Sequence, residues 1–276
     1  MATKIAWTGE TLNPFPGCNK ISPGCLNCYA EKMAARQVGM KTRGYDKIIT
    51  DGHWNGHVCD RMAEAKAKLD KIKKPGTHIF VQSMGDFFHP AIPDLHRDSV
   101  ISWALNRPRL VFQILTKRID EAEYYYQRVG DDAEEFEGIK PPLFDAPNIW
   151  LGVTCENQEW LDRRVPVLLR IPAAVRFLSL EPLLGPLNLR FHLGVAKNHE
   201  DLRGAFDWVI VGCESGPHRR PCKREWVESI LKQCHEADVP VFLKQFEIDG
   251  KVVHDAHMLA DYFGYEVEQI RQWPRE

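Results

Sequence analysis

Short apolar runs rich in Val, Ile and Phe recur along the chain and alternate with longer amphipathic stretches. The runs typical of buried strands cover residues 79–81, 110–115, 149–153, 175–180, 208–211 and 239–243. The stretches between them repeat apolar residues at helical spacing, over residues 60–73, 94–106, 118–128, 156–170 and 225–237. This alternation predicts βαβ units and therefore an α/β fold built on a parallel sheet.

Residues 5–7 are a further candidate for the first strand. They would bring the total to about seven strands, enough for a full or partial TIM-like (β/α) barrel. A doubly wound open sheet is the structural alternative, but no GxGxxG motif follows a predicted strand. We therefore expect a single (β/α) barrel domain over residues 1–276. It would carry an N-terminal cysteine loop at residues 13–30 and an insertion around residues 183–206.

Composition and charge narrow the class of protein. The chain has 276 residues, of which 44% are hydrophobic and 27% charged, as in an ordinary globular enzyme. The net charge of −2 gives no overall field for a nucleic acid or a membrane surface. No signal peptide and no apolar run of membrane-spanning length is present in the sequence, so we expect a cytoplasmic protein without membrane contact.

Three of the eight cysteines, Cys18, Cys25 and Cys28, fall close together near the N-terminus, and the next is Cys59. A closed zinc site or an electron-transfer cluster requires four protein ligands, so a group of three indicates a metal centre with one open position. Chemistry takes place at such a position. The alternatives are three reduced loop cysteines, or a zinc knuckle completed by a distant ligand.

Polar residues follow almost every predicted strand. In (β/α) barrels the reacting groups lie on the loops at the carboxyl ends of the strands, which form the mouth of the barrel. The residues at these ends are Gly85, Asp86, His89, Thr116, Lys117, Arg118, Thr154, Glu156, Ser179, Glu181, Glu214, Ser215, Lys244 and Gln245. We expect them to surround the mouth, with the cysteine loop leaving from the same side.

The cysteine run resembles that of radical S-adenosylmethionine (SAM) enzymes, in which three thiolates hold a 4Fe–4S cluster and leave one iron open. The usual spacing there is C-x3-C-x2-C, whereas this chain has C-x6-C-x2-C. Tyr29 follows the last cysteine, as in spore photoproduct lyase-like members. The last two cysteines thus keep the usual interval and the first interval is wider.

The chain also resembles the phage-encoded three-cysteine-motif family. The matching segments are WTGETLNPFPGCNKISPGCLNCYAEKMAAR, FVQSMGDFFHP, FQILTKR, NIWLGVTCENQ, RFLSLEPLLGP, DWVIVGCESGP and VPVFLKQF. Cys213 stands where that family usually has glycine, and Phe246 where it usually has tryptophan. The resemblance implies a radical SAM-type barrel with a 4Fe–4S cluster bound by Cys18, Cys25 and Cys28.

The resemblance to radical SAM enzymes also implies positions that bind the cofactor SAM. They are Tyr29 beside the last cysteine, Gly85 and Asp86 at the methionyl ammonium, Thr154 and Glu156 at the ribose, and Glu214 with Ser215 at the adenine or the carboxylate. The candidate catalytic residues are Cys213, Lys117 and Glu181. The Cys213 thiol would donate a hydrogen atom to a product radical, or else it packs where glycine would also fit. The carboxylates have a structural alternative too, as partners of nearby cations.

These observations predict an iron–sulfur enzyme that cleaves SAM reductively and needs an electron donor. A partner protein that presents the substrate is compatible with them. Two other functions stay open: a zinc-dependent barrel hydrolase with its ion on Asp86, His89 and Glu181, and a non-enzymatic iron–sulfur redox sensor.

A basic segment follows GCESGP and suggests a nucleotide or nucleic acid as the substrate. Its cations are Arg219, Arg220, Lys223 and Arg224. The alternative is a solvated loop whose cations pair with nearby acids such as Glu225 and Glu228.

Overall fold

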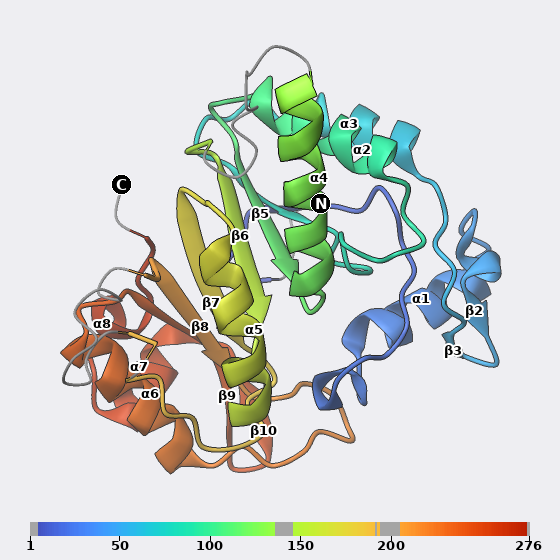
Figure 1. Cartoon of the computed structure of the whole chain (residues 1–276). Helices are drawn as coiled ribbons and strands as arrows, with labels where there is room; N and C mark the ends of the chain where they lie inside the picture. Colours follow the sequence, from blue (N-terminus) through green and yellow to red (C-terminus); the bar gives the residue numbers. More distant parts are fainter. Residues whose placement is uncertain (1–4, 136–145, 191, 194–204, 275–276) are drawn as a thin grey trace. The chain divides into compact units, whose positions relative to one another are not determined.

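The computed structural model describes residues 5–135, 146–190, 192–193 and 205–274 of the chain. Two compact units make up the fold. The first unit comprises residues 1–151 and 170–174, and the second unit comprises residues 152–169 and 175–276. Figure 1 traces the elements of both units from blue at the N-terminus to red at the C-terminus.

The first unit is built on parallel strands. They are β1 (Glu10–Leu12), β4 (His78–Val81) and β5 (Val111–Thr116). Ile79 of β4 lies opposite Glu10 of β1 on one side and Phe112 of β5 on the other. β6 (Ile149–Thr154) begins in this unit, where the Phe112 N–H donates to the Asn148 carbonyl at 2.7 Å. The strands predicted around residues 79–81, 110–115 and 149–153 are therefore confirmed.

The first strand begins later than predicted. Residues 5–7 form a turn, in which the Thr8 N–H donates to the Ile5 carbonyl at 3.3 Å. Pairing with β4 starts at Gly9, whose N–H donates to the His78 carbonyl at 3.1 Å. The prediction of a strand at residues 5–7 is wrong, because this apolar run only supplies the buried ring of Trp7 to the core. A parallel strand does lead into the cysteine loop.

The described residues of the first unit form the helices α1 (Tyr29–Gly39), α2 (Met62–Leu69), α3 (Asp94–Leu105) and α4 (Ile119–Glu135). The last three match the predicted helices. Short elements lie around α1: η1 (Pro23–Cys25), η2 (Tyr45–Lys47), β2 (Ile49–Thr50) and β3 (His53–Trp54). Figure 1 shows α1 beside the β2–β3 hairpin, in the blue part of the chain. The sequence patterns above do not predict this hairpin.

The second unit repeats the parallel arrangement. Its strands are the end of β6, β7 (Val175–Leu180), β8 (Trp208–Gly212), β9 (Val241–Ile248) and the edge strand β10 (Lys251–Val253). The Cys155 N–H after β6 donates to the Ser179 carbonyl of β7 at 2.9 Å. β7, β8 and β9 pair in parallel in that order, and β10 pairs antiparallel with β9. The helices are α5 (Gln158–Arg170), α6 (Arg224–Glu236), α7 (Ala256–Phe263) and α8 (Val267–Ile270).

Burial of the strands follows from this topology. All six residues of β6 and all five of β8 are buried, as expected of parallel strands covered on both faces. The predicted α/β class is confirmed for both units. Closure into a barrel and a single domain over the whole chain stay predictions. Among the described residues, no helix combines the length and apolarity needed to span a membrane.

The insertion expected around residues 183–206 is seen only in part, since residues 191 and 194–204 lie outside the described residues. Its first residues pack against the second unit. Leu183, Leu187 and Leu189 are buried, and the Leu183 N–H donates to the Gly212 carbonyl at 3.0 Å. This start of the insertion is therefore part of the core.

Gly152 of β6 lies against the buried ring of Phe177, and a Cβ added there would meet three ring carbons at 2.6 Å. We expect Gly152→Ala to lower the free energy of unfolding by about 1–3 kcal/mol, the usual cost of overpacking a core. Gly185→Ala is the matched control, because a Cβ there has no neighbour within 4 Å. It should change stability by less than about 0.5 kcal/mol in the same urea titration. Equal effects of the two substitutions would contradict the tight packing of Gly152.

Candidate functional site

Two glycines bring the cysteine loop against the end of β4. Gly17 pairs in parallel with Gly85 as an isolated bridge, and the Gly17 N–H donates to the Met84 carbonyl at 3.0 Å. Gly17 has a φ of 125°, and a Cβ there would lie 2.2 Å from the His57 carbonyl oxygen. A Cβ on Gly85 would lie 2.6 Å from the Gly17 oxygen. The backbones can approach this closely only because both residues are glycine.

The other side of the loop is held by residues 56–61. The Cys59 N–H donates to the Pro16 carbonyl at 2.8 Å, and the Gly56 N–H donates to the Cys18 carbonyl at 3.2 Å. The loop therefore leaves β1 as an extended segment with backbone partners on both sides. This arrangement fixes the position of the first cysteine.

The three cysteines follow within one short stretch, and all are half-buried. Cys18 comes directly after the glycine bridge, Cys25 ends η1, and Cys28 is the N-cap residue of α1. The Ser22 hydroxyl lies 3.7 Å from the Cys25 sulfur. The three thiols thus lie on the segment that joins β1 to α1, and their sharing of one metal centre stays a prediction.

The Cys18 thiol is half-buried and lies near charged side chains. Its pKa is raised to about 12, mainly by burial and also by the nearby Asp86 carboxylate, while the Arg118 cation acts to lower it. Ionised Cys25 and Cys28 would act in the same direction as Asp86. A thiol in this setting stays protonated unless a metal cation stabilises the thiolate.

Asn19 anchors the loop next to Cys18. Its Oδ1 accepts from Nη2 of Arg118 at 2.8 Å and lies 2.7 Å from Nε2 of His89. Nδ1 of His89 accepts from the Ala91 N–H at 3.2 Å, so the ring proton is on Nε2 and is donated to Asn19. Burial, together with the Arg118 cation, lowers the pKa of His89 to about 4. His89 is therefore a neutral donor that holds the cysteine loop.

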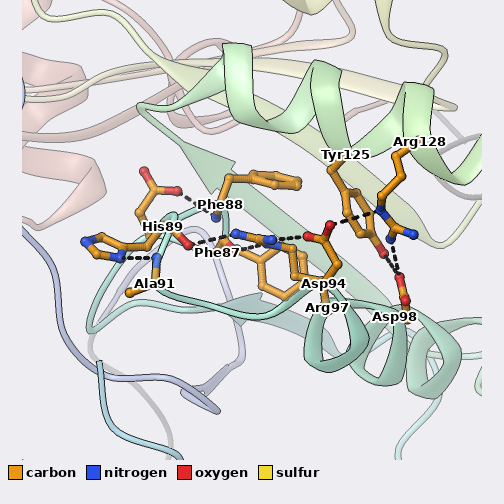
Figure 2. A network of polar contacts seen from close by, with 10 residues as sticks. Phe87, Phe88, His89, Ala91, Asp94, Arg97, Asp98, Tyr125 and Arg128 are labelled. Atoms are coloured by element: carbon orange, nitrogen blue, oxygen red, sulfur yellow. Dashed lines mark hydrogen bonds and ion pairs between the residues drawn. The ribbon is translucent and has the colours of Figure 1, made fainter. Parts of the chain in front are cut away.

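His89 is in turn fixed by Arg97 of α3, as Figure 2 shows. Nη2 of the buried Arg97 donates to the His89 carbonyl at 2.7 Å, and its Nε donates to the Phe87 carbonyl at 3.2 Å. Nη1 of Arg97 donates to the Asp94 carboxylate. One guanidinium thus fixes the loop after β4 through two carbonyls and one ion pair.

The network continues from α3 to α4 (Figure 2). Nε of Arg128 lies 2.9 Å from Asp94, and its Nη2 donates to Asp98 at 3.2 Å. The Tyr125 hydroxyl also donates to Asp98, at 2.6 Å. The polar contacts therefore run without a break from two helices to the loop that carries His89.

Asp86 ties the end of β4 to the end of β5. One carboxylate oxygen accepts from the Thr116 hydroxyl at 2.7 Å and from the Phe88 N–H at 3.0 Å. The other accepts from the Lys117 N–H at 2.9 Å. A carboxylate has about four acceptor positions, so three donors leave about one for a ligand. The predicted contact of Asp86 with an ammonium stays a prediction.

Gly85, Lys117 and Tyr29 also lie around the loop. The Gly85 backbone is held by the glycine bridge, and Lys117 follows Asp86's partner Thr116 at the end of β5. The Tyr29 hydroxyl donates to the Ser83 carbonyl at 2.9 Å. The first unit therefore contains the three cysteines, these three predicted residues and Asp86.

The remaining predicted residues belong to the second unit, where Thr154 and Glu156 contact the buried Arg164 of α5. Nη1 of Arg164 donates to the Thr154 carbonyl at 2.6 Å and to the Glu156 carboxylate at 2.9 Å. The Arg164 guanidinium also lies 4.1 Å from the centre of the Trp160 ring. The Glu156 carboxylate therefore neutralises a buried cation, which is the structural alternative named for it above.

Glu181 and Cys213 lie near Lys244. Nζ of Lys244 is 2.9 Å from Oε1 of Glu181, and a Cβ on Gly212 would lie 2.7 Å from the same oxygen. Gln245 donates from Nε2 to the Cys213 carbonyl at 2.7 Å. Burial, together with the Glu181 carboxylate, raises the pKa of Cys213 to about 12. Cys213 is thus a protonated, buried thiol next to an ion pair.

The arginines of the basic segment pair with carboxylates, one of which belongs to Glu214. The Glu214 carboxylate accepts from the Arg220 N–H at 2.8 Å and from Nη2 of Arg220 at 2.5 Å. Arg219 pairs with Glu247, and Arg224 pairs with Glu228 at 2.6 Å. These cations are therefore largely neutralised. Ser215 lies in the loop that follows β8.

In the described parts of the chain, no three His, Cys, Asp or Glu side chains are arranged so that they could hold a metal ion. The three thiols share a loop but their sulfurs are not preset around one point. For the zinc alternative, Asp86 and His89 lie in the first unit and Glu181 in the second.

The residues that hold the site in place are not among those predicted from the sequence. Asn19 directly follows the first cysteine, and Asp94, Arg97 and Asp98 share one helix face through spacings of three and four. Either pattern could have been noticed. The groups that Arg97 contacts could not have been predicted, because its hydrogen bonds to residues 87 and 89 depend on how the loop after β4 turns.

A family model described as "Protein of unknown function (DUF5131)" matches residues 2–262 of the chain. No curated protein and no solved structure matches it.

The protonation of His89 predicts a pH dependence of stability. The pKa of His89 is about 4 in the folded protein, whereas a histidine in the unfolded chain has a pKa of about 6.5. The unfolded state therefore binds more protons between these values, and stability should fall as the pH decreases from about 6.5 to about 4. His89→Gln keeps a hydrogen-bond donor for Asn19 and does not titrate. The free energy of unfolding of this variant should therefore decrease less than that of the wild type over the same pH range.

Urea unfolding at several pH values measures the effect. Burial also lowers the pKa of His78, so a smaller pH dependence should remain in the variant. An unchanged pH profile in His89→Gln would contradict the buried, neutral state of His89.

Proposed function

We propose that the chain, which belongs to the DUF5131 family, is a radical SAM-type enzyme that holds a 4Fe–4S cluster on Cys18, Cys25 and Cys28. The observation that carries this proposal is the placement of three half-buried thiols on one short segment, whose start is held by backbone hydrogen bonds on both sides. When bound, such a cluster supplies the electron that cleaves the sulfonium of SAM.

The donor set suits a cluster with one iron that lacks a protein ligand. The next cysteine along the chain, Cys59, lies in a small hydrophobic cluster with Ala30, Ala34 and Tyr45. Its buried thiol packs against Gly44, where an added Cβ would lie 3.1 Å from the sulfur. Cys59 is therefore a packing residue, and the three thiols of the loop make up the set that we propose.

Protein groups around the loop have distinct parts in the proposed enzyme. The Asn19 contacts with His89 and Arg118 would hold the chain beside Cys18 in place while the metal binds. The free acceptor position of Asp86 would take a hydrogen bond from the ammonium of SAM. Gly85 would keep Asp86 beside the cysteine loop, since the space that a side chain would fill is taken by the Gly17 backbone.

The second unit supports the proposal less directly. Glu156 and Glu214 both have arginine partners, so their first effect is to hold Thr154, the loop after β6 and the loop after β8. Contacts of these loops with the ribose, the adenine or the carboxylate of SAM are part of the proposal. Closure of the parallel strands into a full or partial barrel is also part of the proposal.

The substrate class is narrowed by the basic segment. Arg219, Arg220 and Arg224 each have a carboxylate partner, so little free positive charge is left for phosphates. Lys223 lies 4.0 Å from Glu225, too far for a strong ion pair. Among these cations, the one without a close carboxylate partner is Lys223, so the basic segment supports a nucleotide or nucleic acid substrate only weakly.

A hydrogen-atom donor role for Cys213 would suit the protonated state of its thiol.

Cleavage of SAM is the direct test. Anaerobically reconstituted protein incubated with SAM and dithionite should release 5′-deoxyadenosine, which chromatography and mass spectrometry can measure. We expect Cys25→Ala to abolish the release, because two remaining thiols cannot hold the cluster. Cys222→Ala is the matched control, since Cys222 is also a half-buried cysteine but lies in the second unit.

The control variant should release 5′-deoxyadenosine at the wild-type rate. Iron-loaded wild-type protein that produces none would overturn the proposed reaction, and full release by Cys25→Ala would overturn the ligand assignment.

A further inference from the structure

Two neighbouring loops of the first unit concentrate positive charge at the amino ends of β4 and β5. Residues 70–77 join α2 to β4, and residues 106–110 join α3 to β5. Together they contain five cations and one acid, in a chain whose net charge is −2. The cations are Lys71, Lys73 and Lys74 in the first loop and Arg107 and Arg109 in the second, and the acid is Asp70.

The two loops contact each other. The Gly76 N–H of the first loop donates to the Arg109 carbonyl of the second at 2.8 Å. Nη2 of Arg107 donates to the Asp70 carboxylate at 2.6 Å. These contacts bring the charges of both loops onto one surface. We call it the cation surface, and its members are the exposed side chains of Lys71, Lys73, Lys74 and Arg109.

Hydrogen bonds hold the backbone of each loop. Nδ2 of the buried Asn148 donates to the Arg107 carbonyl at 3.2 Å and to the Leu110 carbonyl at 3.1 Å. The Thr77 hydroxyl donates to the Lys74 carbonyl at 2.7 Å. The cations therefore extend from a fixed scaffold, which lowers the entropic cost of binding a partner.

The acids near the cation surface already have other partners. The Asp70 carboxylate lies 2.8 Å from Nζ of Lys66 and also pairs with Arg107. Glu10, at the start of β1, lies 2.9 Å from Nζ of Lys68. In the part of the chain that the structure describes, no carboxylate forms an ion pair with any member of the cation surface.

Helix ends do not account for these cations. The carboxyl end of a helix favours positive charge in its last turn, and in α2 that turn already contains Lys66 and Lys68. Lys73 and Lys74 lie beyond it. The basic segment after β8 shows the opposite arrangement, because its arginines pair with carboxylates. The cation surface keeps its charge available for a partner.

We infer that the cation surface binds the phosphate backbone of a nucleic acid. Phosphates are contacted mainly by lysine and arginine side chains, and such contacts need no apolar neighbours. Neither loop carries an exposed large hydrophobic side chain, which the centre of a protein interface would need. The cations also lie on a folded surface, not on an amphipathic helix that could enter a membrane.

The cation surface is separate from the cysteine loop. It lies at the amino end of β4, whereas the bridge between Gly17 and Gly85 holds the cysteine loop beyond the carboxyl end. The four residues of β4, at about 3.3 Å each, lie between them. Binding of a nucleic acid here needs neither a metal nor SAM, so the inference goes beyond the proposed function and does not rest on it.

Salt-dependent binding is the test. Fluorescence anisotropy of a labelled DNA duplex is measured with the full chain, without iron or SAM. Contacts with three to four phosphates predict a slope of about −3 to −4 for the logarithm of the association constant against that of the salt concentration. We expect the double variant Lys73→Gln and Lys74→Gln to bind at least about tenfold more weakly at about 0.1 M salt and to reduce this slope by about 2.

The second loop is tested by Arg109→Gln, which should reduce the slope by about 1. The matched control is the double variant Lys232→Gln and Lys251→Gln, which changes two exposed lysines of the second unit. It alters the net charge as much as the test variant does, and it should bind DNA as the wild type does.

Three results would overturn the inference. The first is a wild type that shows no salt-dependent binding of the duplex. The second is an equal loss of affinity in the two double variants, since binding would then follow overall charge. Polyglutamate and phosphatidylserine vesicles supply the third: if either binds through Lys73 and Lys74 while DNA does not, the surface belongs to an acidic protein or to a membrane.

Discussion

The close contact between Gly17 and Gly85 is the constraint on which the site depends. It holds the chain after β1 against the end of β4, at a separation that leaves no room for a side chain on either residue. Cys18 follows at once, so its position is set by backbone hydrogen bonds rather than by a flexible loop. The residues after β4 are fixed by the same contact, which places Asp86 and His89 beside the cysteine loop.

A buried polar network stabilises this arrangement. Arg97 is 6% exposed and uses three of its nitrogens on the loop after β4 and on Asp94. Leaving one of these partners unpaired in the interior would cost about 1–3 kcal/mol, so the loop has one strongly preferred conformation. The helices α3 and α4 thereby support a loop that they do not contain, and His89 passes this support to Asn19.

Much of the fold follows from sequence periodicity, because parallel strands buried on both faces and amphipathic helices have distinct patterns. The apolar run at residues 5–7 was misread because a turn can bury Trp7 as well as a strand can. The sequence also placed polar residues at the strand ends correctly, as in Thr116, which ends β5. It could not show that Glu156 and Glu214 are paired with arginines, since Arg164 and Arg220 reach them only through the folded chain.

The central claim is that Cys18, Cys25 and Cys28 hold an iron–sulfur cluster with one iron open to SAM. Metal and sulfide analysis of the anaerobically reconstituted protein, together with the electron paramagnetic resonance spectrum of its reduced form, tests this most directly. We expect about four irons and four sulfides per chain and a spectrum that changes when SAM is added. One zinc per chain without sulfide, or a cluster spectrum indifferent to SAM, would contradict the claim.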